Sequence, residues 1–135
     1  MIHIKLNINK SLQVNFTGIV EWSNGAKVWY KEGKKHREDG PAVEWDNGFK
    51  YWCKNGKLHR EDGPAIEYYP EYEHEDCADY REWYLEGKRY SSSWLTGDKL
   101  ILSEEPHPKY PNILIYKILE KNKIEEYLLI PGMKE

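Results

Sequence analysis

Hydrophobic and polar residues alternate at the start of the chain. Residues 2–8 carry isoleucine or leucine at every second position, with polar residues between them. A period of two is typical of a β-strand with one buried face. The run Asn-Lys-Ser at 9–11 suits a turn, and residues 12–16 are again rich in apolar side chains. The pattern therefore predicts an N-terminal hairpin over residues 1–16, in which residues 12–16 pair with the first strand.

A 23-residue pattern then occurs twice without a gap, at residues 21–43 and 44–66. Sixteen of the 23 paired positions are identical, and the longest identical run is HREDGPA, at 36–42 and 59–65. Decayed copies lie on either side, so the repeats are predicted to extend over residues 17–90. A fixed period of this length is the signature of a repeat architecture.

Each complete unit is predicted to hold two short strands and two connections. The Asn-Gly pairs at 24–25 and 47–48 are tight-turn signals, because both residue types adopt positive φ at low cost. Pro41 and Pro64 cannot donate a hydrogen bond within a central strand, so HREDGP should be a longer connection. The predicted strands are 26–31, 42–45, 49–54 and 65–69. The fold class that follows is mainly β, an antiparallel meander of repeated hairpins.

The residues after the repeats predict a small C-terminal cap over 91–135. Residues 71–79 are acidic and are interpreted as a solvated loop. Ser92 or Ser93 is placed to cap a short helix over 94–102, and three prolines between 106 and 111 predict an extended connector. Residues 113–119 and 124–130 favour a terminal hairpin over a single helix, because they are rich in β-branched residues around a Lys-Asn turn. The cap should cover the open end of the sheet, since a bare edge invites aggregation.

Composition and charge narrow the function classes. At 135 residues the chain is expected to form a single domain. Its formal charge is −3, so it lacks the broad positive field that duplex nucleic-acid binding uses. No apolar run approaches the length of a membrane span, and no signal peptide is visible. A cytoplasmic protein is expected, with Cys53 and Cys77 as free thiols.

Three short sequences carry a resemblance to a known family. They are WYKEGK at 29–34, WCKNGK at 52–57 and WYLEGK at 83–88. These resemble the MORN repeat, in the variant found in bacterial and phage proteins that include antitoxin-like members. The HREDGPA extension is similar to small repeat proteins encoded by tailed phages. The resemblance covers about residues 15–90 and implies an elongated sheet of hairpins without catalytic apparatus. It would place a phage-encoded protein in the host cytoplasm.

The repeated corner supplies the candidate ligand-binding residues. Arginine presents a planar fork that matches phosphate, and aromatic faces can stack on a base. An alternative stays open: the same corner is the scaffold of the repeat, with arginine paired to Glu or Asp and the aromatic rings in the core. The candidates are His36, Arg37, His59, Arg60, Trp29, Trp52, Tyr30 and Tyr51.

No motif for catalysis is recognisable. The sequence lacks a nucleophile–base pattern, a P-loop, a dinucleotide fingerprint and metal-ligand spacing, so no enzyme, metal or cofactor is expected. Two binding functions remain. The first is a phage-type anti-defence protein that sequesters an anionic, nucleotide-like signal. The second is a protein–protein interaction module, such as an antitoxin-like inhibitor or adaptor, with purely structural repeats. A homo-oligomer is compatible with both.

Overall fold

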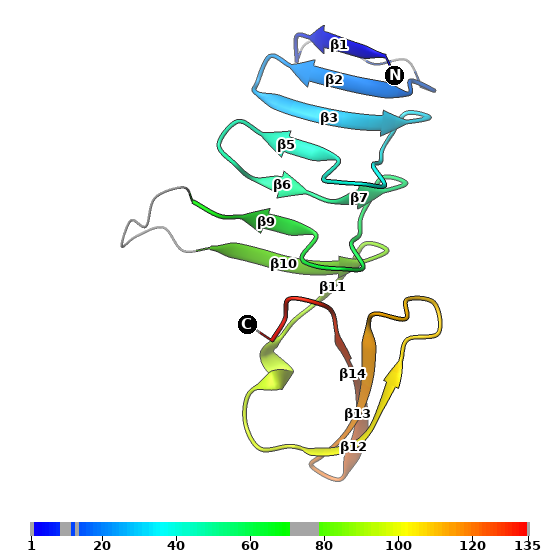
Figure 1. Ribbon diagram of the computed structural model, residues 1–135, viewed down its shortest axis with the longest axis vertical. Coiled ribbons are helices and arrows are strands. Elements are labelled where there is room, and N and C mark those ends of the chain that lie inside the picture. The colour runs from blue at the N-terminus through cyan, green and yellow to red at the C-terminus, as the bar shows by residue number, and fades with distance from the viewer. Residues whose placement is uncertain (1, 9–11, 13, 71–78, 135) are drawn as a thin grey trace.

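A computed structural model describes residues 2–8, 12, 14–70 and 79–134. The chain is mainly β: the strands of residues 3–90 lie side by side along one long axis, and the last three strands form a separate group at the lower end of the view (Figure 1). The strands are β1 (His3–Leu6), β2 (Gly18–Trp22), β3 (Ala26–Lys31), β4 (Lys34–Lys35), β5 (Val43–Trp45), β6 (Lys50–Tyr51), β7 (Cys53–Lys54), β8 (Lys57–Leu58), β9 (Ile66–Tyr68), β10 (Tyr80–Leu85), β11 (Lys88–Tyr90), β12 (Leu100–Pro106), β13 (Leu114–Glu120) and β14 (Lys123–Leu129). One turn of 3-10 helix spans Ser93–Leu95.

The repeat strands form one sheet. Its order is β1-β2-β3-β5-β6-β9-β10-β11, with β4 paired to β3, and β7 and β8 form a separate two-stranded pair. The four strands predicted from the two repeats are adjacent and antiparallel, as Val28↔Val43, Val43↔Tyr51 and Tyr51↔Ile66 show. The mainly β, antiparallel character predicted from the sequence is therefore confirmed.

The two Asn-Gly turns use their asparagines differently from the prediction. Gly25 and Gly48 have positive φ (92° and 99°), but the asparagines before them do not. Instead, Oδ1 of Asn24 accepts a hydrogen bond from the N–H of Ala26 at 3.1 Å, and the Asn47 turn contains the equivalent bond. Asparagine is favoured here because its side chain imitates a backbone turn.

In the repeats, turns with two successive positive φ angles lie at the opposite ends of the strands from the Asn-Gly turns. They are Glu32-Gly33, Asn55-Gly56 and Glu86-Gly87. Each stacks on the unit before it: the N–H of Gly56 donates to the carbonyl of Lys35, and the N–H of Gly87 donates to that of Leu58, both at 2.9 Å. The aliphatic stem of Lys34 lies over Gly56, 3.7–3.9 Å from where a Cβ would stand, so the positive φ, not space, favours glycine here.

The predicted N-terminal hairpin is wrong. β1 pairs with β2 in parallel, with Ile4 opposite Val20, and residues 12 and 14–16 form no strand. Residues 1, 9–11 and 13 of the predicted hairpin lie outside the described residues. A parallel pair requires the chain to cross over between the strands rather than turn tightly. Beside this pairing, the carbonyl of Ile2 accepts a hydrogen bond from the N–H of Ile19 at 2.7 Å. A Cβ on Gly18 would lie 2.4 Å from that carbonyl oxygen, so the glycine permits the contact.

The C-terminal segment corrects one prediction and confirms another. The helix predicted over 94–102 is wrong: only Ser93–Leu95 is helical, Gly97 then has a φ of +86°, and β12 begins at Leu100. The terminal hairpin is confirmed by β13 and β14, which join β12 in a three-stranded antiparallel sheet. The acidic-loop prediction and the thiol of Cys77 fall almost wholly outside the described residues.

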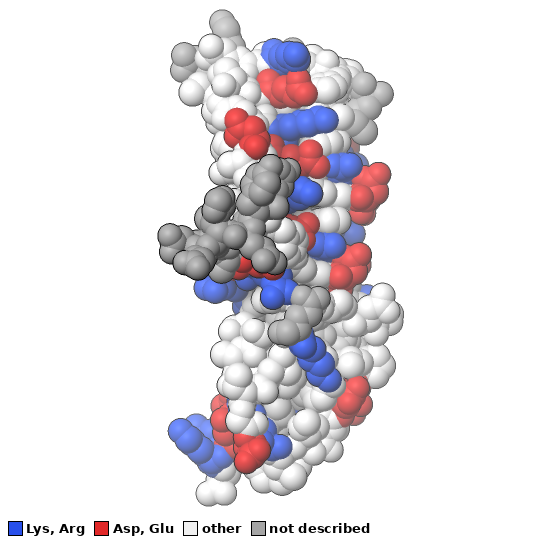
Figure 2. All heavy atoms as spheres, turned by 60° about the vertical axis from the view of Figure 1, so that its left-hand side comes forward, with Lys and Arg blue, Asp and Glu red and all other residues white. Residues whose placement is uncertain are grey.

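One face of the repeat sheet carries charges of alternating sign. Seven residues lie directly opposite one another on successive strands, so that each cation has anions beside it. Figure 2 shows the resulting alternation of blue and red along the long axis. Opposite charges on paired strands stabilise a sheet, whereas like charges destabilise it. We call this row the charge ladder; in spatial order it is Lys5, Glu21, Lys27, Glu44, Lys50, Glu67 and Arg81.

The opposite face of the sheet is aromatic. Ala26, Val28 and Val43 are buried there beneath larger, half-buried side chains. Those larger side chains are Trp22, Tyr30, Trp45 and Tyr51. Farther along the sheet, Phe49 stacks on Tyr68 with 4.6 Å between ring centroids. The strands form a single layer in Figure 1, so these aromatic rings bury the smaller side chains on their own face. We call this surface the aromatic face.

Replacing Gly18 with alanine is expected to destabilise the protein by about 1–3 kcal/mol, because the new methyl group meets the backbone of Ile2. Gly97→Ala is the matched control: Gly97 also has positive φ but a Cβ there has no atom within 4 Å among the described residues. Urea denaturation of both variants isolates the steric contact. Equal destabilisation would contradict the close approach of β1.

Candidate functional site at the repeated corner

The guanidinium of each corner arginine is held by its own repeat. Nε of Arg37 donates to Asp39 at 3.1 Å and Nη1 donates to the Pro41 carbonyl at 3.1 Å. Arg60 makes the same two bonds, at 2.8 and 3.1 Å, and its Nη1 also reaches Glu67 at 3.2 Å. Pro41 and Pro64 therefore contribute their carbonyls as well as turning the chain.

Each guanidinium also lies flat on a tryptophan. Arg37 is 4.0 Å from the ring centroid of Trp29, and Arg60 is 3.7 Å from that of Trp52. On its other side the arginine covers the glycine of HREDGP: a Cβ on Gly63 would lie 2.8–3.1 Å from the Arg60 guanidinium. The residues that recur in both corners thus build one sandwich of glycine, arginine and tryptophan, in which cation–π attraction contributes about 0.5–2 kcal/mol.

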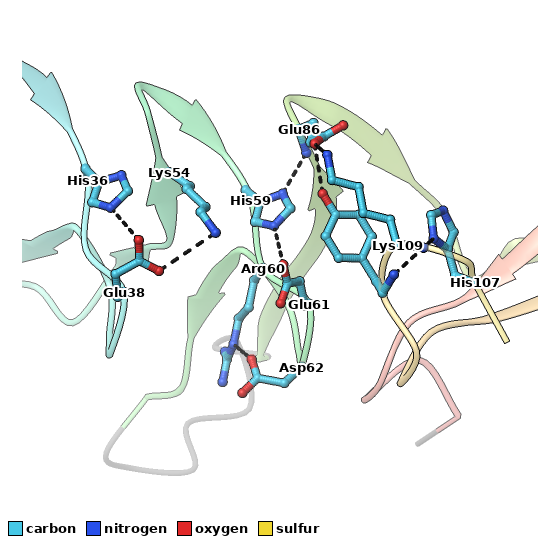
Figure 3. A network of polar contacts seen from close by, with 11 residues as sticks. His36, Glu38, Lys54, His59, Arg60, Glu61, Asp62, Glu86, His107 and Lys109 are labelled. Atoms are coloured by element: carbon cyan, nitrogen blue, oxygen red, sulfur yellow. Dashed lines mark hydrogen bonds and ion pairs between the residues drawn. The ribbon is translucent and has the colours of Figure 1, made fainter.

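The two histidines connect one repeat to the next. Nδ1 of His36 accepts a hydrogen bond from the N–H of Asn55 at 3.0 Å, and Nδ1 of His59 accepts one from Glu86 at 2.9 Å. Because Nδ1 is an acceptor, the neutral ring carries its proton on Nε2. That nitrogen faces Glu38 in the first corner, at 2.8 Å (Figure 3). Both nitrogens of each buried imidazole are therefore used within the protein.

Carboxylates complete the corner network. Glu38 lies between His36 and Lys54, whose Nζ is 3.8 Å away (Figure 3). The hydrogen bond from His36, more than the charge of Lys54, lowers the pKa of Glu38 below its usual range. In the second corner, Oε1 of Glu67 accepts the indole N–H of Trp52 at 3.0 Å. The charge ladder and the corner thus share Glu67.

In the third, incomplete unit the C-terminal cap covers the tryptophan that an arginine covers in the first two. Ser91 stands where the corner arginine would be, and Trp83 instead donates its indole N–H to the carbonyl of Pro131 at 3.2 Å. Trp83 and Leu85 pack in a core with residues of the cap. Those residues are Tyr110, Ile113, Ile130 and Met133. The tail therefore packs against Trp83 and Leu85 of β10.

Glu86 links the last repeat to the cap. Its carboxylate pairs with the ammonium of Lys109 and accepts the hydroxyl of Tyr110 at 2.8 Å (Figure 3). The hydrogen bond from Lys109, followed by that from Tyr110, lowers the pKa of Glu86. Burial and the nearby Glu86 raise the pKa of the Tyr110 hydroxyl. The glutamate therefore stays charged, and the junction stays linked, above the lowered pKa.

The eight sequence-predicted ligand residues do not meet in one place. Each arginine joins the tryptophan and histidine of its own corner, on the charged side of the sheet. Tyr30 and Tyr51 belong to the aromatic face on the opposite side. A ligand role for these residues stays a prediction, while their contacts are those of a scaffold.

Two hollows lie beside the corners. One, of about 250 Å³, is lined by three cations (Arg37, Lys54, Arg60) and three carboxylates (Glu38, Glu61, Asp62), so its charges balance. The other, of about 460 Å³, is lined by Lys54, Asn55, Lys57, His59, Glu86 and Lys109. Three lysines face one glutamate there. This lysine cluster was not predicted from the sequence, because only Lys57 follows a Gly-Lys step, whereas Lys54 lies in β7 and Lys109 belongs to the cap.

Comparisons with known proteins add no assignment. No protein-family model, curated protein or solved structure matches this chain. Among the described residues, no group of three or more histidine, cysteine, aspartate or glutamate side chains could hold a metal ion. Within the same residues, no helix has the length and apolar character needed to cross a membrane.

Replacing Arg60 with alanine is expected to lower the free energy of unfolding by about 2 kcal/mol, because the stacking on Trp52 is lost and Glu67 and Pro64 lose a donor. Arg60→Lys should restore little, since lysine lacks the planar fork. Urea denaturation measures both variants. The control is Arg89→Ala, which removes an exposed arginine paired with Glu82 and should cost about 0–1 kcal/mol. If Arg60→Ala were no more destabilising than this control, the corner arginine would not be a structural element.

Proposed function

We propose that the protein is a MORN-like repeat protein that acts as a non-catalytic protein–protein interaction module, with the aromatic face as its binding surface. The observation that carries the proposal is a hollow of about 280 Å³ in that face. Its apolar lining includes Trp22, Val28, Val43 and Trp45, and Lys35 stands among the lining residues. Tryptophan and tyrosine concentrate at the centres of protein interfaces.

The architecture supports this surface as a binding site. Domains usually bury the apolar face of a sheet against a second layer. In the described part of the chain the repeat sheet is a single layer, and its large aromatic rings stay half-exposed. A partner with an apolar anchor beside a carboxylate fits the apolar hollow and the ammonium of Lys35.

The corner network favours this function over a catalytic or phosphate-clamping role. The arginines and histidines that would grip a phosphate make structural bonds instead. These residues recur because each complete unit uses the same arginine and histidine contacts to hold its own corner. The repeats are thereby a rigid support for the faces that they present.

The test is quantitative capture from the cells that carry the gene, using three forms of the protein. Trp45→Ala removes a central ring, and Lys35→Glu reverses the charge of the hollow without removing a core side chain. Each should reduce a specific captured protein at least about tenfold, because a central interface tryptophan typically contributes about 2 kcal/mol or more. Lys50→Ala, on the opposite face, is the matched control and should retain the partner. Retention of the same partner by Trp45→Ala and Lys35→Glu would refute the proposal.

A second candidate function is the sequestration of an anionic, nucleotide-like signal, as in an anti-defence protein. The observation that favours it is the hollow with three lysines and one glutamate. Its volume lies within the usual range for small-molecule sites, about 300–1,000 Å³. Lys57 is the cation there without an ion pair among the described residues, so it is the first choice for a phosphate contact.

Calorimetric titration with cyclic and ADP-ribose-type nucleotides tests this candidate. If it is correct, one nucleotide binds, Lys57→Ala weakens binding at least about fivefold, and the melting temperature is unchanged because the lysine is exposed. Lys88→Ala, at the equivalent step of the next unit but outside this hollow, is the matched control. Binding that is unaffected by Lys57→Ala, or absent at millimolar nucleotide, would reject the site.

A further inference from the structure

The charge ladder ends on a cation at the open edge of the sheet. In the described strands β1 has β2 as its only neighbour. Lys5 and His3 both face Glu21, at 3.8 and 3.4 Å. The side chain of Lys5 is nevertheless 85% exposed, so the side of Lys5 away from Glu21 is open to solvent. From Lys5 to Arg81, each residue of the ladder has the opposite charge to its neighbour. A carboxylate beside Lys5 would continue this alternation.

The backbone of β1 can accept another strand. The carbonyls of Ile2 and Leu6 are used by β2, accepting from Ile19 at 2.7 Å and from Ser23 at 2.8 Å. Because successive residues of a strand direct their N–H and C=O groups to opposite edges, those of His3 and Lys5 point to the open edge. An added strand would satisfy these groups, which is how sheets recruit extended segments of other proteins.

The face of β1 opposite the charge ladder indicates which other residues a partner strand would carry. Ile2, Ile4, Leu6 and Ile8 alternate with the ladder residues, and Ile2 and Ile8 are 59% and 56% exposed. A strand beside β1 would place its acidic residues next to Lys5 and its alternate residues next to these apolar side chains. From this we infer that β1 is a docking edge for an extended segment of a protein partner in which acidic and apolar residues alternate. This inference rests on the proposed role as a protein-interaction module and names the edge and the partner's chemistry.

A second copy of the chain does not supply this partner through its own β1. In an antiparallel pair that keeps the two faces of the sheet, Lys5 would lie opposite His3, Lys5 or Asn7 of the second copy. None of these residues carries a negative charge. Self-pairing would therefore set like charges against each other, or charge against a neutral amide, and charge complementarity selects a different, acidic chain.

The experiment uses the full chain, labelled with nitrogen-15, and three seven-residue peptides. One alternates valine and glutamate, the second alternates valine and lysine, and the third is the glutamate peptide with proline at its centre. The glutamate peptide is expected to shift the amide signals of His3 and Lys5 saturably. The lysine peptide should bind at least about fivefold more weakly, which corresponds to the upper value of one cross-strand charge pair. The proline peptide should not bind, because proline interrupts the ladder of hydrogen bonds.

Charge reversal provides the decisive comparison. Lys5→Glu should invert the preference, so that the lysine peptide binds more tightly than the glutamate peptide. Lys31→Glu, the same substitution on an exposed lysine of β3, is the matched control and should leave the preference unchanged. Melting temperatures of both variants verify that the fold is intact. An inverted preference is a gain of binding, which a merely unfolded variant cannot produce.

Three outcomes would overturn the inference. They are equal binding of the two charged peptides, signal shifts confined to residues outside β1, and peptide-free self-association through β1 that rises with protein concentration. The result is separable from the test of the aromatic face. Trp45 lies in β5, three strand positions away from β1, so loss of the captured partner by Trp45→Ala with intact peptide binding would reject the face alone.

Discussion

The stacking of an arginine between a glycine and a tryptophan is the contact on which the repeat depends. A Cβ at residue 63 would lie 2.8 Å from Cζ of Arg60, so the guanidinium over Trp52 would have to shift, and Asp62 and the Pro64 carbonyl accept the hydrogen bonds that orient it. One contact therefore explains why the letters Arg, Asp, Gly and Pro recur together. It also covers the tryptophan of each complete unit with an arginine of the same unit, so that this ring needs no second layer of structure.

The sequence was sufficient for the parts of the fold that follow from local pattern. The 23-residue register predicted adjacent antiparallel strands, and the Lys-Asn turn predicted the terminal hairpin; both are present. Local pattern failed where distant residues decided the outcome. The apolar residues 12–16 suggested a hairpin, but Gly18 lets β1 approach β2 in parallel instead. Similarly, a capping serine suggested a helix over 94–102, but residues 100–102 belong to β12, which pairs with β13.

The residue types of the candidate site could be predicted from the sequence, but the contacts between them could not. The residue types of HREDGPA fit both an anion clamp and a scaffold, and only the contacts distinguish them. His36 reaches Asn55 nineteen positions away, a separation that no local reading reveals. The charge ladder was hidden for the same reason, because its members become neighbours through strand register. The lysine hollow, in turn, requires the cap to bring Lys109 beside the second repeat.

Because each complete unit covers its own tryptophan, the length of the protein depends on the number of units in fixed steps. A unit adds two strands to the sheet, and neighbouring strands lie about 4.8 Å apart, so each copy lengthens the protein by about 10 Å. Of the corner tryptophans, Trp29 and Trp52 are covered by the arginines of their own units, whereas Trp83 is covered by the cap. Tandem duplication of 23 codons would therefore lengthen the chain without any change to either end. Distance between the first strand and the cap is a quantity that selection can adjust in fixed steps.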